Sequence, residues 1–133
     1  MNLKCVHLLI YCLNLLEEKV RQRFIYCLDH HLVDRALNEM LKAGRFPGWF
    51  SREFCFDSLY ARLNGLRECL SCASANDLLR LDGTNFNYHL ELSERIIDWL
   101  IGETGMDRKV VQALAHELSD KLSKLLSEKQ TPA

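Results

Sequence analysis

Cys69 and Cys72 are the first residues whose type and spacing could bind a metal ion. Two thiolates with two residues between them match one half of a structural zinc site, and zinc needs two further ligands. His89 or the adjacent pair His30 and His31 could supply these ligands if the fold brought them near. No second Cys-x-x-Cys or His-x-x-x-His pattern accompanies the pair, and no βαβ pattern surrounds it as in redox proteins. We therefore expect two thiols at a helix end, with neither a metal nor another cofactor.

Arg23 and His30 form a second candidate pair, because six residues separate them and His31 follows. This spacing resembles the Arg-x4–6-His motif of the HEPN family of helical ribonucleases. The resemblance implies that the pair would support attack by an RNA 2′-hydroxyl group. The polar residue that often follows the arginine in that family is Phe24 here, and we expect a helix boundary at Asp29, between the two residues. We expect an arginine and a histidine without a catalytic task, in a chain that is not an enzyme.

Residues 96–118 contain two predicted helices joined by a short glycine-containing turn, which is the minimum of a helix-turn-helix. In that interpretation Arg108, Lys109 and Gln112 would begin the recognition helix. Residues 85–103 carry four acidic side chains against a single basic one, whereas phosphate contacts dominate the affinity for nucleic acid. The formal net charge of −1 adds no general attraction to phosphate. We therefore favour an ordinary αα-hairpin, with nucleic-acid binding weak or absent.

The composition indicates a folded single domain. The chain has 133 residues, of which 48% are apolar and 26% charged, with only 2 prolines. The apolar run at 6–16 has no signal-peptide cleavage site after it and is shorter than the ~20 residues of a membrane span. Four of the six cysteines fall within apolar helical patterns, where cysteine acts as a small buried hydrophobe: Cys5, Cys12, Cys27 and Cys55. We expect an intracellular protein, cytoplasmic or nuclear, with reduced thiols and no membrane.

The spacing of apolar residues predicts helices over most of the chain. The last helix is the clearest, from Gly105 to Glu128, with Thr104 and Asp107 resembling a capping box before it. Gly44 and Gly102 are expected to close two of the earlier helices, whereas Gly65 is expected to lie inside one. The other predicted helices span about 3–28, 30–43, 52–70 and 86–101, with a loop at 71–76 and one helical turn at 77–81.

No stretch of useful length alternates between polar and apolar residues, so we expect no sheet. The predicted fold class is all-α, a bundle of five main helices plus one short helical turn, in which the first and last helices are long. One domain is expected over residues 1–128, followed by a frayed tail at 129–133.

The functional hypothesis depends on a surplus of apolar and aromatic residues. The first helix carries more apolar residues than one stripe needs, and the last helix is longer than the helix before it. Aromatic residues are enriched at protein interfaces. We expect a non-catalytic interaction module, an adaptor or assembly domain, that self-associates or binds another protein. Helix-turn-helix nucleic-acid binding and HEPN-like ribonuclease activity are the alternatives. The residues expected to contact a partner are Trp49, Phe50, Trp99, Leu122 and Leu125.

Overall fold

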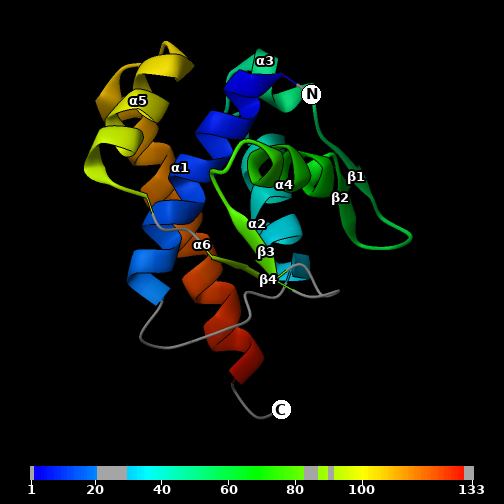
Figure 1. Cartoon of the computed structure of the whole chain (residues 1–133). Coiled ribbons are helices and arrows are strands. Elements are labelled where there is room, and N and C mark those ends of the chain that lie inside the picture. The colour runs from blue at the N-terminus through cyan, green and yellow to red at the C-terminus, as the bar shows by residue number, and fades with distance from the viewer. Residues whose placement is uncertain (1, 21–29, 83–86, 90–91, 131–133) are drawn as a thin grey trace.

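A computed structural model describes residues 2–20, 30–82, 87–89 and 92–130 as a mostly helical fold (Figure 1). The described helices are α1 (Leu3–Val20), α2 (His30–Lys42), α3 (Gly48–Ser51), α4 (Leu66–Ala75), α5 (Glu94–Thr104) and α6 (Arg108–Gln130). The described strands are β1 (Cys55–Asp57), β2 (Arg62–Asn64), β3 (Arg80–Asp82) and β4 (Asn87–His89). The strands form two antiparallel pairs, β1 with β2 and β3 with β4. The predicted all-α fold class is confirmed, whereas the prediction that no sheet forms is wrong.

Helix α1 lies at the centre of the fold. Every residue from Cys5 to Asn14 is buried, and α6, α5 and α4 all pack against this helix (Figure 1). A helix that is covered on all sides must be apolar around its whole circumference, which explains why its sequence exceeds one stripe. The surplus apolar residues of this helix are Leu8, Ile10, Tyr11 and Leu15. The first three are buried inside the chain and form no partner surface, and Leu15 is partly buried against the core. The remainder of the first predicted helix, residues 21–28, lies outside the described residues.

Helix α2 ends at a left-handed glycine, as the sequence predicts. Gly44 has a φ of 69°, a conformation that glycine adopts without a steric cost. Its N–H donates to the carbonyl of Leu41, and the N–H of Arg45 donates to the carbonyl of Met40, both at 3.1 Å. These two bonds satisfy carbonyl groups that the helix leaves unpaired at its end. The chain can therefore turn directly from α2 toward α3.

The helix predicted over 52–70 is wrong before Leu66, because β1 and β2 form a hairpin there. Phe56 lies opposite Leu63 across this hairpin, and Leu63 is buried against α2. Leu59 and Tyr60, which the helical pattern places in the core, are instead 80% and 66% exposed in the loop between the two strands. The hairpin projects from the body of the molecule on the side away from α5 (Figure 1).

Helix α4 begins directly after Gly65 and continues through the predicted loop at 71–76 as far as Ala75. Gly65 has a φ of 101°, and a Cβ atom there would lie 2.3 Å from the backbone oxygen of Glu53. Glycine is therefore required by its backbone conformation and by the close approach of a second segment. It marks the start of α4 and is not an interior weakness of a longer helix.

The next two helical predictions also need correction. Strand β3 replaces the end of the helical turn predicted at 77–81, and strand β4 replaces the start of the helix predicted at 86–101. Helix α5 begins at Glu94 and passes through Gly102, so that glycine does not close it. Helix α6 agrees with its prediction and extends to Gln130, two residues into the predicted tail. Residues 131–133 lie outside the described chain.

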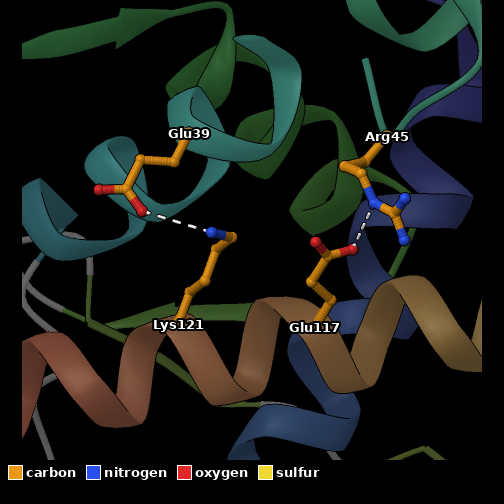
Figure 2. A network of polar contacts seen from close by, with 4 residues as sticks. All are labelled: Glu39, Arg45, Glu117 and Lys121. Carbon is orange, nitrogen blue, oxygen red and sulfur yellow. Dashed lines mark hydrogen bonds and ion pairs between the residues drawn. The ribbon is translucent and has the colours of Figure 1, made fainter. Parts of the chain in front are cut away.

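Helix α6 packs along both α1 and α2. Two ion pairs join its polar side to α2 and to the turn after α2 (Figure 2). The Arg45 Nε atom lies 2.9 Å from Glu117 Oε2, and the Lys121 Nζ atom lies 3.6 Å from Glu39 Oε2. Both pairs are partly exposed and contribute at most about 1 kcal/mol each, so apolar burial holds α6 in place. The buried apolar side chains of α6 lie along one side of the helix: Val111, Leu114, Ala115, Leu118, Leu122 and Leu125.

Candidate functional site

Helix α5 is a short helix with well-defined ends. The Ser93 hydroxyl group accepts a hydrogen bond from the Ile96 N–H at 3.4 Å and thereby caps the first turn. Gly105, with a φ of 67°, reverses the chain after the last turn. Leu100 and Ile101 are buried on the inner face, where α5 packs against α1. The helix is therefore a firm support for the side chains on its outer face.

Thr104 closes α5, although the sequence suggested that it caps α6. Its hydroxyl group donates to the Ile101 carbonyl at 2.6 Å and accepts from the Met106 N–H at 3.2 Å. At many helix ends, an N–H beyond the last turn donates directly to a carbonyl of that turn. Here the buried Thr104 hydroxyl group bridges the carbonyl and the N–H instead. Helix α6 is capped by Asp107 alone, whose Oδ1 atom accepts from the Lys109 N–H at 2.8 Å.

The outer face of α5 exposes two large apolar side chains. Ile96 is 37% exposed and Trp99 is 49% exposed, one turn apart on the same helix. The indole ring of Trp99 meets the ring of His7 on α1 edge-on, with centroids 4.9 Å apart and an interplanar angle of 63°. Such aromatic contacts favour one ring orientation. Trp99 is therefore held in place by the body of the fold while half of its surface faces solvent.

His7 is almost fully covered, and its Nδ1 atom has no hydrogen-bond partner among the described residues. Burial lowers the pKa of His7, because a charged imidazolium loses its hydration there, while the nearby Glu103 carboxylate opposes this shift. The imidazole is thus favoured in its neutral form. A neutral ring can pack against the indole of Trp99 without the cost of burying a charge.

Trp49 and Phe50, which the sequence suggests as partner contacts, lie in the short helix α3. Phe50 is fully buried between Phe46 and Phe54, with ring centroids 4.3 Å and 4.8 Å away. It cannot contact a partner at the surface, so this assignment is corrected. Trp49 is half-buried against the core, and its ring centroid lies 5.9 Å from the Lys4 Nζ atom. Of the two residues, Trp49 alone retains accessible surface.

Leu122 and Leu125 are also covered within the chain itself. Leu122 has no exposed surface and Leu125 is 8% exposed, although both were expected to extend beyond a single bundle. The expectation compared the length of α6 with that of the preceding helix and allowed the first helix to cover only part of the remainder, whereas α1 and α2 both pack on α6. These two leucines therefore belong to the core. Trp99 and Trp49 are the expected contact residues that remain at the surface.

The residues proposed for a DNA-reading helix do not form a free basic surface. Arg108 donates a hydrogen bond to Asp98 on α5, which raises the pKa of the arginine. Lys109 is exposed, and Gln112 is partly covered. Helices α5 and α6 each pack mainly against α1, whereas a helix-turn-helix packs its two helices on each other.

Three of the described cysteines are core groups, whereas Cys55 lies exposed on strand β1, so the prediction that it is a buried residue of a helix is wrong. Cys5, Cys12 and Cys69 are buried, and burial raises the pKa of Cys5 to about 11 and that of Cys12 to about 12. Burial likewise raises the pKa of Cys69, its neighbour Cys72 being half-buried. Such thiols stay protonated at neutral pH and are poor nucleophiles.

Only some of the residues proposed for a metal site or a ribonuclease site lie within the described residues. No group of three or more His, Cys, Asp or Glu residues is placed to bind a metal within the described residues. The side chains of His30, His31 and His89 lie outside that description, as does the whole of Arg23. The described residues therefore contain neither a set of metal ligands nor the Arg23–His30 pair.

Asp34 is a buried site that sequence reasoning missed. It lies on α2 with no exposed surface, and its Oδ1 atom accepts from the Leu63 N–H at 3.0 Å. Its Oδ2 atom accepts from the Arg67 guanidinium group at 3.2 Å. One carboxylate thus ties α2 to both β2 and α4. The only sequence signal is an acidic residue beside the apolar stripe of α2, which does not identify these partners.

None of the helices in the described part of the chain combines the length and the apolar character that crossing a membrane requires. No protein-family model matches the chain, and neither the curated proteins nor the solved structures contain a significant match.

Proposed function

We propose that this chain is a non-catalytic helical interaction module, an adaptor or assembly domain, that self-associates through the outer face of α5. The observation that carries the proposal is the position of Trp99, half-exposed on a helix with capped ends. Tryptophan is the residue type most often found at the energetic centre of protein interfaces. A rigid indole loses little conformational entropy when a partner covers it.

Other exposed apolar side chains compete with α5, and Leu3 and Val110 are single aliphatic residues among them. Leu59 and Tyr60 are more exposed than Trp99, but they lie in the loop of a two-stranded hairpin. Isolated hairpins of this size are marginally stable, so a partner would have to order the loop. Trp49 sits in a four-residue helix and is already partly covered by the core. Helix α5 offers the firmer surface, so it supports the proposal best.

The proposed module acts inside the cell, in the cytoplasm or nucleus. The support is the burial of protonated thiols in the core, since a reducing compartment keeps such thiols free. No observation favours nucleic-acid binding or ribonuclease activity as a second function. The pairing of Arg108 with Asp98 argues against the first of these.

Sedimentation equilibrium over protein concentrations from about 1 μM to about 1 mM tests this proposal. We expect the mass to rise with concentration, and Trp99→Ala to weaken self-association at least tenfold, or about 1.4 kcal/mol. Leu59→Ala is the matched control, because it also removes an exposed apolar side chain but lies on the hairpin. Thermal unfolding checks that both variants remain folded. A chain that stays monomeric at every concentration, or equal effects of the two variants, would contradict the proposal.

A further inference from the structure

The outer face of α5 is arranged symmetrically about Trp99. Arg95 lies four residues before Trp99 and Glu103 lies four residues after it, while Ile96 and Gly102 lie three residues before and after. Residues three and four apart share one side of a helix, so all five lie on the same side. All five are exposed. The positive charge therefore stands at one end of this face and the negative charge at the other.

We infer that the partner on this face is a second copy of the chain, with the two α5 helices antiparallel about a two-fold axis beside Trp99. The inference rests on the proposed function, in which α5 is the interface. In a two-fold interface, when residue i of one copy contacts residue j of the other, j also contacts i. Antiparallel pairing centred on Trp99 therefore places Arg95 of each copy opposite Glu103 of the other.

The remaining residues of this face fit the same arrangement. Ile96 of one copy lies opposite Gly102 of the other, because the two positions are equally far from Trp99. A Cβ atom at Gly102 would meet no atom within 4 Å, so the space above this glycine is open in the single chain. Glycine lets a second helix approach closely, as at other helix contacts built on small residues. The Ile96 side chain of one copy thus fits over Gly102 of the other, which has no side chain.

The charges also discriminate between orientations of the two helices. Parallel pairing of two α5 helices would bring Arg95 against Arg95 and Glu103 against Glu103, and like charges at an interface suppress that orientation. Asp98 is already engaged by Arg108 within the chain. Arg95 and Glu103 make no such ion pair with the described residues, so both are available to a second copy.

The contact is small, and we infer a weak dimer. One helix pair buries less than the ~1,200 Å² that marks the lower limit of stable interfaces. Exposed ion pairs contribute little to affinity, so the two indole rings at the centre supply most of the attraction. The charged pairs then fix the orientation, as the flanking charges of coiled coils do.

A charge-exchange experiment on the full chain tests this geometry. Arg95→Glu and Glu103→Arg each turn two attractive contacts into two repulsive ones, so each variant alone should dimerise at least tenfold more weakly than the wild type. An equimolar mixture should recover the wild-type dissociation constant, because both contacts of the mixed dimer are attractive: one joins the two substituted residues and the other joins the unchanged Arg95 to the unchanged Glu103. Glu94→Arg is the control, since it makes the same charge change on an exposed residue outside this face.

Each outcome of sedimentation equilibrium then decides one point. Recovery in the mixture supports the antiparallel dimer, and circular dichroism confirms that the variants are folded. If Trp99→Ala dissociates the dimer but the mixture remains as weak as its components, α5 is the interface and the antiparallel pairing is wrong. If the wild type is monomeric throughout, this inference and the proposed self-association both fail. If Glu94→Arg weakens the dimer as much as Glu103→Arg, net charge and not position is responsible, and the inference fails.

Discussion

Asp34 brings a negative charge into the interior and uses both carboxylate oxygens there. Asp34→Ala would leave the Leu63 N–H and the Arg67 guanidinium group without their acceptor, so we expect a loss of about 3–5 kcal/mol in the free energy of unfolding. Asp34→Asn retains an acceptor oxygen for Leu63 and should cost less than the alanine variant. Urea unfolding at neutral pH measures both changes. A loss below about 1 kcal/mol for the alanine variant would show that this carboxylate does not tie the elements together.

Single residues show where sequence reasoning stops. Thr104 and Asp107 are three residues apart, and that spacing suggested one cap for α6. In the structure they serve two different helices, because Gly105 turns the chain between them. Spacing predicts that hydroxyl and carboxylate groups cap something, but the carbonyl or N–H that they bind depends on where the turn falls.

At the scale of elements, Gly65 is the residue on which the start of α4 depends. Gly65→Ala would place a methyl group against the Glu53 carbonyl and hold alanine at a positive φ. We expect the free energy of unfolding, measured with urea, to fall by about 1–3 kcal/mol or more. The Glu53 carbonyl oxygen belongs to the backbone and cannot rotate away from the added methyl group. Gly102→Ala is the matched control. It lies inside α5 with open space around it and should be neutral or stabilising by up to about 1 kcal/mol. Equal effects of the two substitutions would contradict this account.

The long helices could be predicted from the sequence, but the hairpin could not. Helices α2 and α6 each carry one clear apolar stripe, which only a helix explains. Phe56 and Leu63 are seven residues apart, a spacing that also fits two helical turns. In the hairpin these two residues are cross-strand partners. The same seven-residue spacing therefore fits both a helix and a hairpin, and it does not distinguish between them. The loop between the strands has no glycine and places Ala61 at a φ of 53°, so the usual turn signal is absent.

At the scale of the whole molecule, the burial of Leu125 changes the expected role of the second half of α6. Leu125→Asp would place a charge among the residues of the core, and we expect it to lower the melting temperature by the same amount at every protein concentration. Lys124→Asp, at the exposed neighbouring position, is the control and should have a small effect. Differential scanning calorimetry at several concentrations distinguishes the two roles of Leu125. If the variant stays folded and only its self-association is lost, Leu125 is an interface residue and the prediction is wrong.

The proposed surface could be predicted in part. The sequence singles out Trp99 because it lies on a different face from the apolar stripe of its helix, and that separation persists in the structure. Phe50, Leu122 and Leu125 have the same apolar character, and their burial depends on which helices cover them. The sequence of one helix does not contain that information, because coverage is a property of the assembled fold.

The central position of α1 also affects how the chain must be made. Residues 5–14 leave the ribosome before their main cover, α6, has been synthesised, because α6 begins only at Arg108. Contacts so distant in sequence form late, because a long loop must close first. Throughout translation the most apolar helix therefore lacks its main cover, and its two thiols, Cys5 and Cys12, lack their final protection. A growing chain of this kind is a natural client for chaperones that hold apolar segments until synthesis is complete.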